Sequence, residues 1–216
     1  MSKLFLYEEM NTLKKYGHLS DIPDIIRTGL SDHIVLRDYQ EEAFQYFISY
    51  VENEALSKNK QIHTLFHMAT GSGKTVIMAG LILYLYTKGY RKFLFFVNQT
   101  NILEKTKENF TEPLSSKYLF ADEIEYLGDK IKINSVSNFS GLSANDDINI
   151  CFTTIQKLHS DLTTQKENSL TFEDFRKHKI VLISDESHHI NVQTKAEMEL
   201  FESWENTVQH IFEQNR

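Results

Sequence analysis

Short continuous runs of apolar residues recur along the chain, and each one ends in a polar cluster. Four such runs are found, at 64–68, 93–97, 148–152 and 180–183. Helical periodicity is found at 74–87, 101–110 and 154–162. Continuous apolar runs are typical of strands that helices cover on both faces, and their alternation with helices is typical of α/β domains. The pattern therefore predicts an α/β fold, a mostly parallel sheet with helices on both faces.

The segments around this pattern are less regular. Residues 1–33 are expected to form a helical N-terminal extension, and residues 34–216 the α/β domain. One amphipathic helix is predicted before the first run, because five residues share a helical face: Tyr39, Ala43, Phe44, Phe47 and Val51. Residues 111–147 are expected to be an insertion or irregular crossover, with one strand within IKINSV (131–136).

The carboxyl ends of parallel strands lie along one edge of a sheet, and open α/β sheets bind their ligands there. The polar clusters ATGSGKT, NQTN, TTIQ and SDESHH each follow one of the four apolar runs. These clusters are distant in sequence, but the fold predicts that they converge on one edge.

The segment MATGSGKT (68–75) is the most specific chemical signal. Gly71 and Gly73 permit backbone conformations in which successive N–H groups form an anion-binding nest. Lys74 can reach the outer phosphates of a nucleotide, and Thr75 can offer a hydroxyl to Mg²⁺. A helix that begins here adds its positive end. The segment predicts a phosphate loop, although Met68 stands where the usual pattern has its first glycine.

An acidic pair, Asp185 and Glu186, follows the last apolar run. A phosphate loop needs an acid to hold the metal and a base to polarise water, and this pair can supply both. A transition-metal site that includes His188 and His189 is disfavoured, because adjacent histidines point in different directions. Helical zinc motifs space their histidines four residues apart instead.

Composition and charge change this picture little. The chain of 216 residues is 41% hydrophobic and 25% charged, which is typical of a globular protein. A net charge of −7 mildly disfavours a free-standing nucleic-acid binder, although a local groove can still be positive. Cys151 is the single cysteine, so neither an internal disulfide nor a cysteine-based zinc site is possible. No apolar stretch is long enough to span a bilayer, so we expect a cytoplasmic protein without a membrane partner.

Together, these motifs resemble those of superfamily 2 helicases and translocases of the DEAD/DEAH type, which have RecA-like P-loop NTPase lobes. ATGSGKT, NQTN, TTIQ and DESH resemble motifs I, Ia, Ib/Ic and II, and LRDYQEEA (36–43) resembles the Q motif. The combination is most similar to the Res subunit of type III restriction enzymes. The resemblance covers roughly residues 34–192.

The resemblance implies a role for each matching residue. Residues that would bind ATP are Gln40, which would recognise adenine, and Thr70, Gly71, Ser72, Gly73, Lys74 and Thr75. Thr75 and Asp185 would hold Mg²⁺, Glu186 would activate water, and His188 would couple the ATP site to a nucleic-acid groove. Six polar residues would contact a nucleic-acid backbone: Asn98, Gln99, Thr100, Thr153, Thr154 and Gln156. The same six could instead act as helix caps, and Gln40 could simply belong to the start of an amphipathic helix.

The family also implies partners and a second lobe. Double-stranded DNA and a modification (methyltransferase) subunit are the expected partners. Catalytic arginines of such motors come from a second lobe, and the sequence is expected to stop before motif III and that lobe. The residues at its end are expected to form a helix with an apolar face, made by Leu200, Phe201, Trp204, Val208, Ile211 and Phe212.

Two other functions stay open. One is a stand-alone DNA or RNA helicase lobe. The other is a nucleotide-binding regulatory module that uses the phosphate loop as a switch without nucleic acid; the acidic charge favours it, and the NQTN and TTIQ clusters disfavour it.

Overall fold

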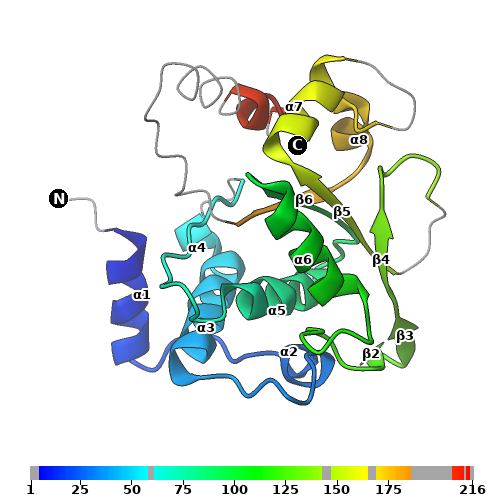
Figure 1. Ribbon diagram of the computed structural model, residues 1–216. Coiled ribbons are helices and arrows are strands. Elements are labelled where there is room, and N and C mark those ends of the chain that lie inside the picture. Colours follow the sequence, from blue (N-terminus) through cyan, green and yellow to red (C-terminus); the bar gives the residue numbers. More distant parts are fainter. Residues whose placement is uncertain are drawn as a thin grey trace.

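The computed structural model describes residues 5–57, 61–142, 147–164, 169–185, 206–211 and 213–214 (Figure 1). Its helices are α1 (Leu6–Lys15), α2 (Asp24–Gly29), α3 (Asp38–Glu52), α4 (Glu54–Ser57), α5 (Lys74–Thr87), α6 (Thr100–Thr111), α7 (Ile155–Thr163) and α8 (Phe172–Lys177). Its strands are β1 (Lys92–Val97), β2 (Ile124–Tyr126), β3 (Asp129–Ile131), β4 (Ile133–Val136), β5 (Ile148–Thr154) and β6 (Ile180–Ser184).

The main sheet has the strand order β4-β5-β1-β6, and every neighbouring pair in it is parallel. β1 lies between the other two long strands, with Val97 opposite Thr154 of β5 and Phe96 opposite Ser184 of β6. The parallel α/β sheet predicted from the apolar runs is therefore confirmed. β2 and β3 form a separate antiparallel pair.

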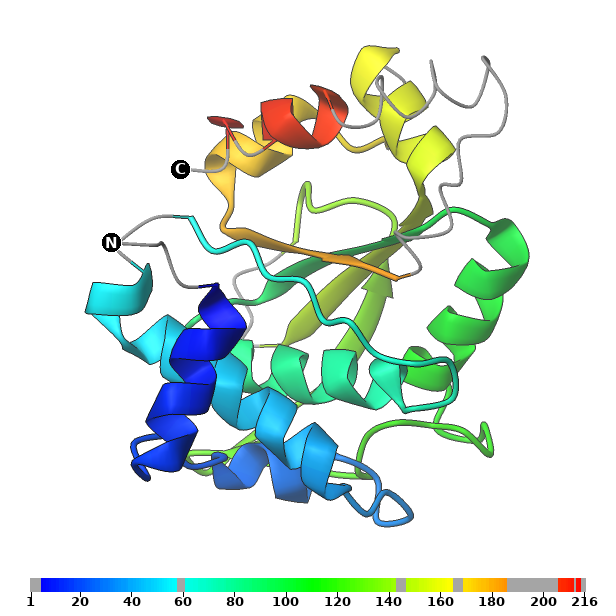
Figure 2. The same cartoon turned by 90° about the vertical axis from the view of Figure 1, so that its left-hand side faces the viewer.

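Helices cover both faces of this sheet, because the side chains of β1 alternate between two hydrophobic cores. Phe93, Phe95 and Val97 belong to the larger core, which also contains residues of α2, α3, α5 and α6. Leu94 and Phe96 belong to the smaller core, which contains residues of α7 and α8. Figure 2 shows α3 and α5 on one side of the sheet and α7 and α8 on the other. Such double coverage explains why the strands are apolar without alternation.

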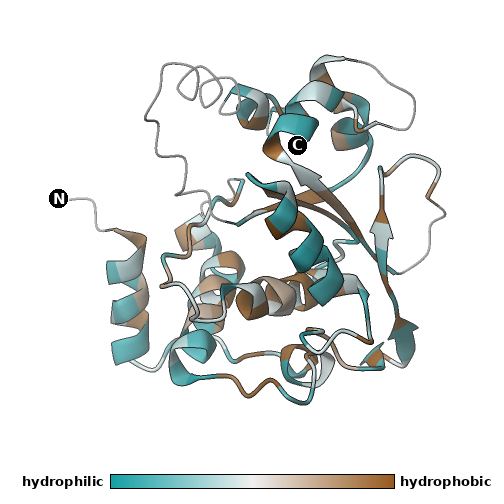
Figure 3. Ribbon diagram, in the orientation of Figure 1, coloured by the Kyte–Doolittle hydropathy of each residue, from teal (hydrophilic) through white to brown (hydrophobic). Residues whose placement is uncertain are grey.

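The layer beneath the sheet is built around α5. Hydrophobic residues concentrate in this helix and in the strands, whereas the visible face of α6 is mainly hydrophilic (Figure 3). Eight residues of α5 are buried, so it has no polar face of the kind a surface helix shows. Gly80 lets α3 approach closely, since a Cβ there would lie 2.4 Å from Cζ of the buried Phe44. This contact fixes α3 against α5.

The predicted strand at 64–68 is wrong. Residues 61–69 form neither helix nor strand in the structure, and Figure 2 shows the segment as an unpaired coil on the α5 side of β6. Phe66 and Met68 pack against the larger core, whereas Leu65 is 83% exposed. The segment is thus covered on one side only, and apolar content alone did not distinguish it from a paired strand.

Residues 111–147 are more regular than expected. They contain the β2–β3 pair, and IKINSV divides into the end of β3 and strand β4, which joins the main sheet beside β5. An isolated bridge between Leu30 and Phe120 also ties this region to the end of α2.

The remaining predicted helices agree closely with the structure. The ranges 39–51, 74–87, 101–110 and 154–162 correspond to α3, α5, α6 and α7. At the C-terminal end, residues 206–211 are helical and Ile211 is buried. The other predicted face residues, apart from Val208, lie outside the described residues.

Candidate functional site

The glycine-rich segment between residues 69 and 73 forms a tight loop that leads into α5. The backbone N–H and the hydroxyl of Ser72 both donate to the carbonyl of Ala69, at 3.2 and 2.6 Å. Gly71 and Gly73 have φ angles of +78° and +85°, in the left-handed region that favours glycine. The conformations that the sequence predicted for an anion nest are therefore present.

The first turn of α5 is suited to an anion. Gly73 occupies the N-cap position, no side chain caps the helix, and the first turn contains no acidic residue. The N–H groups of a first turn have no partner within the helix and carry the positive end of its dipole. Lys74 and Thr75 are the first two residues of this turn.

Two side chains from α3 hold the loop. The Tyr39 hydroxyl and the Gln40 amide nitrogen both donate to the Ser72 carbonyl, at 2.8 and 2.9 Å. Gln40 is 5% exposed, whereas Tyr39 is 42% exposed. The expectation that Tyr39 belongs to the apolar face of the helix is wrong, because its position at the start of α3 directs its hydroxyl to the loop.

The carboxyl ends of β1, β5 and β6 lie on the same side of the molecule as the phosphate loop (Figure 2). Asp185 directly follows β6, and its backbone N–H donates to the Phe96 carbonyl at 3.3 Å. Asp185 thus lies beside the end of β1. Glu186 and His188, the other two predicted residues of this motif, and His189 lie outside the described residues.

The polar clusters after β1 and β5 also meet, as predicted from the parallel sheet. The Gln156 amide nitrogen donates to Oδ1 of Asn98 at 2.9 Å, across 58 positions of sequence. Gln99, Thr100 and Gln156 are exposed at this edge. These side chains are therefore placed where a ligand along the edge could reach them.

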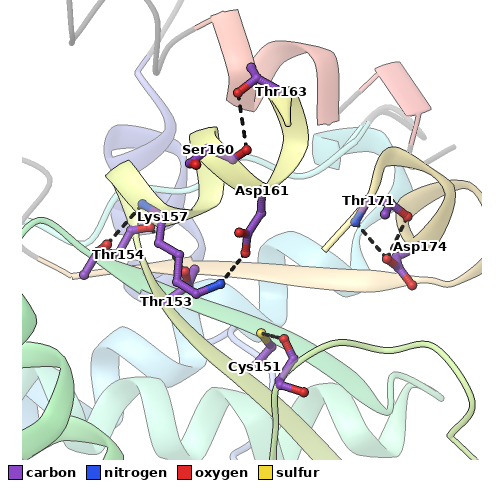
Figure 4. Close-up of polar contacts among 10 residues, drawn as sticks. Cys151, Thr153, Thr154, Lys157, Ser160, Asp161, Thr163, Thr171 and Asp174 are labelled. Atoms are coloured by element: carbon purple, nitrogen blue, oxygen red, sulfur yellow. Dashed lines mark hydrogen bonds and ion pairs between the residues drawn. The ribbon is translucent and has the colours of Figure 1, made fainter. Parts of the chain in front are cut away.

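The two threonines of TTIQ differ in their surroundings. Thr154 caps α7, since its Oγ1 accepts from the backbone N–H of Lys157 at 3.2 Å (Figure 4). Thr153 is 2% exposed, and its hydroxyl lies 3.3 Å from the Thr154 carbonyl. Successive strand residues point to opposite faces, so the pair cannot present both hydroxyls to one surface ligand from within β5.

The three helices that begin at this edge differ in charge from the others. α1, α2, α3 and α8 have acidic residues in the first turn. In contrast, α5, α6 and α7 have none there. An acidic side chain would offset the positive end of a helix dipole. The starts of α5, α6 and α7 are therefore suited to phosphate groups even though the whole chain carries a net charge of −7.

The comparisons with known proteins bear on this arrangement. Residues 33–216 match the family model described as "Type III restriction enzyme, res subunit". The chain belongs to this family. A curated relative, the probable type III restriction-modification enzyme HindVIP Res subunit of Haemophilus influenzae, is 46% identical over 164 residues. The alignment covers 74% of this chain and 32% of the relative, so the chain spans about a third of that protein's length. No solved structure matches.

The family assignment confirms both the expected resemblance and the fold, a RecA-like P-loop lobe. The residues present also fit a nucleotide with its magnesium ion. The loop supplies left-handed glycines, an uncapped helix start and a lysine, and Asp185 follows the strand beside β1 at the same edge.

The single cysteine of this Res-family lobe is buried. Burial raises the pKa of the Cys151 thiol to about 12, so this cysteine is not a candidate nucleophile. Its Sγ contacts the Ser137 carbonyl, below the Lys157–Asp161 ion pair on α7 (Figure 4). Among the described residues, no three His, Cys, Asp or Glu side chains are grouped as a metal site would require. The helices within the described ranges are all too short or too polar to cross a membrane.

Sequence reasoning missed the contact of Tyr39 with the loop, and with it the role of Arg37. The Arg37 guanidinium donates to the Tyr39 hydroxyl at 3.1 Å. The motif LRDYQ contains both Arg37 and Tyr39, but a hydrogen bond from position 39 to position 72 is a tertiary contact that no local pattern reveals.

Proposed function

We propose that this chain is the ATP-binding motor lobe of a DNA-dependent ATPase, within the restriction subunit of a type III restriction-modification system. The observation that carries the proposal is the glycine loop at the start of α5, which two side chains of α3 hold, on the same side of the molecule as the carboxyl end of β6, which Asp185 follows. Family membership supports the same reading. Residues 34–216 would form the lobe and residues 1–33 its helical extension, in a cytoplasmic protein.

In this proposal the phosphate loop binds the triphosphate of ATP. The N–H groups of Gly71, Gly73, Lys74 and Thr75 would donate to phosphate oxygens, and the Lys74 ammonium would neutralise charge on the outer phosphates. Gln40 would contact adenine through the second N–H of its amide or the second lone pair of its oxygen, since one of each is used within the protein. Thr75 and Asp185 would hold Mg²⁺, which withdraws charge from the phosphate oxygens during hydrolysis. Glu186 would orient and deprotonate water, and His188 would couple this site to nucleic acid.

The nucleic-acid side of the proposal places a DNA backbone across the starts of α6 and α7. Gln99, Thr100 and Gln156 are exposed there, and Asn98 and Thr154 are half-buried beside them. Amide and hydroxyl groups at helix starts contact phosphates without reading sequence. Thr153 would contribute through its main-chain groups, because its hydroxyl is buried. A modification subunit is the proposed protein partner, because the relative's name places it in a restriction-modification enzyme.

We expect Lys74→Ala to weaken ATP·Mg²⁺ binding by about 10- to 100-fold, since a hydrogen bond to a charged group is worth about 1.5–3 kcal/mol. Isothermal titration at low salt measures this. Lys132→Ala is the matched control: it removes one exposed lysine at the opposite end of the sheet, beside the start of β4. Equal affinities in the two variants, or no binding by the unaltered protein, would refute the ATP site.

Replacing Gln99 and Gln156 together with glutamate should weaken binding to duplex DNA by about 10-fold, because each change puts a negative charge beside a phosphate. Fluorescence anisotropy with two unrelated duplexes measures the loss, which should be the same for both sequences. Gln45→Glu on α3 makes the same substitution away from the edge. If the chain is a nucleotide-binding regulatory module instead, the unaltered protein should not bind DNA. A preference for single-stranded RNA would favour a stand-alone helicase lobe.

A further inference from the structure

The Ser72 carbonyl receives two hydrogen bonds from one helix. The Tyr39 hydroxyl donates to it at 2.8 Å, and Nε2 of Gln40 donates to it at 2.9 Å. We call this arrangement of Tyr39, Gln40 and the Ser72 carbonyl the Ser72 latch. It joins the start of α3 to the middle of the phosphate loop, more than 30 positions away in sequence.

Both ends of the Gln40 amide take part in holding local structure. Its Oε1 accepts from the backbone N–H of Arg37 at 3.0 Å, while its Nε2 donates to Ser72. Gly73 permits this close approach, since a Cβ there would lie 2.3 Å from Nε2. The amide thus fixes the loop against the first turn of α3 whether or not it also contacts a base.

The latch also determines where the next N–H group points. The C=O and N–H of a trans peptide are antiparallel, and the described chain has no cis peptide. Because the Ser72 carbonyl points toward α3, the Gly73 N–H points away from α3. Rotation of this peptide would exchange an N–H donor for a carbonyl oxygen, which repels an anion.

Arg37 strengthens the outer half of the latch. Its guanidinium donates to the Tyr39 hydroxyl at 3.1 Å, so this hydroxyl accepts from a cation and donates to Ser72. A hydroxyl that accepts from a charged donor becomes a better donor itself. The chain Arg37–Tyr39–Ser72 therefore holds the carbonyl in place from the surface side.

We propose that Tyr39 is a positioning residue of the phosphate loop, which acts with Gln40 to keep the Ser72–Gly73 peptide in its phosphate-binding orientation. The proposal rests on the proposed ATP site. Tyr39 itself touches neither phosphate nor base. Its contribution is the same for every nucleoside triphosphate, because it acts on the backbone of the loop.

Tyr39→Phe tests this proposal by removing one hydroxyl from a partly exposed ring. We expect the dissociation constant for ATP·Mg²⁺ to rise about fivefold, as for loss of one net hydrogen bond. Tyr46→Phe is the matched control, because Tyr46 lies on the same helix and its hydroxyl bonds Asn11 instead, at 2.7 Å. Both variants and the unaltered protein are titrated with ATP·Mg²⁺ and with purine riboside triphosphate·Mg²⁺, which lacks only the 6-amino group.

Four outcomes distinguish the possibilities. An equal loss with both triphosphates in Tyr39→Phe, and none in Tyr46→Phe, supports the latch. Affinity in Tyr39→Phe equal to that in Tyr46→Phe, while Lys74→Ala still loses binding, overturns the latch and leaves the ATP site standing; so does a loss confined to ATP, which would mean that Tyr39 acts on the base. If the unaltered protein binds neither ligand, the proposed ATP site itself is wrong, and the latch with it.

Discussion

Replacing Gly73 with alanine is expected to weaken ATP·Mg²⁺ binding by at least about 100-fold, since two or more charge-assisted hydrogen bonds are lost when the loop is displaced. Two costs act together. The residue has a φ of +85°, which disfavours any residue with a Cβ. The added Cβ would also lie 2.3 Å from Nε2 of Gln40, so the amide and the loop must separate. Isothermal titration at low salt measures the affinity.

Gly89→Ala provides the control for backbone strain. Gly89 follows the other end of α5 with a φ of +90°, and no heavy atom lies within 4 Å of its Cβ position. The strain of the positive φ should lower the free energy of unfolding by about 1–2 kcal/mol in both variants, and the approach to Gln40 should add to the loss in Gly73→Ala. Only Gly73→Ala should alter nucleotide affinity. Equal affinities in the two variants would show that the close approach of Gln40 to Gly73 is not needed for binding.

Phe44→Ala is expected to lower the free energy of unfolding by about 3–5 kcal/mol, the usual cost of deleting a buried aromatic ring. Phe44 is 0% exposed, and its ring lies directly against Gly80 of α5, which has no side chain of its own to fill the space. Domains of this kind are stable by only about 5–15 kcal/mol. Urea denaturation followed by circular dichroism measures the change.

Val35→Ala is a control for the general effect of truncating an apolar side chain. Val35 is 84% exposed, so its truncation should change stability by less than about 0.5 kcal/mol. A loss below about 1 kcal/mol in Phe44→Ala would mean that α3 and α5 close the cavity, since the cost of such a substitution depends on how far its surroundings collapse. Helix α3 would then be less rigidly placed than the contact with Gly80 indicates.

Local periodicity predicted the helices well because local interactions determine them. The range 74–87 coincides with α5, and α3, α6 and α7 each differ from their predicted ranges by one residue at both ends. The apolar runs at 93–97, 148–152 and 180–183 are paired strands in the structure, and helices cover both faces of the sheet they form. Strand β4 (Ile133–Val136) lies within IKINSV, where one strand was predicted without its bounds.

The run at 64–68 shows what periodicity cannot supply. A strand exists only when its backbone pairs with a neighbour, and the sequence of one segment does not say whether that neighbour is beside it. Thr64, Leu65 and His67 are exposed here, so only part of the apolar run is covered by the rest of the protein. The structure places this segment on the core by Phe66 and Met68 alone.

The candidate site was predictable to the extent that it depends on glycine, charge and strand ends. Gly71, Gly73 and Lys74 are where the motif placed them, and Asn98 meets Gln156 because parallel strands share an edge. Strand alternation alone could have separated buried Thr153 from the cap residue Thr154. The second role of Gln40 and the role of Tyr39 depend on the packing of α3 on α5, which only the fold reveals.

The unpaired segment before the phosphate loop has a consequence for thermodynamic coupling. No ladder of backbone hydrogen bonds joins residues 61–69 to the sheet, so the loop is anchored through α5 and the first turn of α3. The two residues after Gln40 extend this connection: Glu41 pairs with Arg27 of α2 and Glu42 with Lys14 of α1, each at 2.7 Å. Local unfolding free energies differ between parts of a domain. Order gained at the loop would thus be shared with α5 and α3, and through these two ion pairs it would extend to α1 and α2.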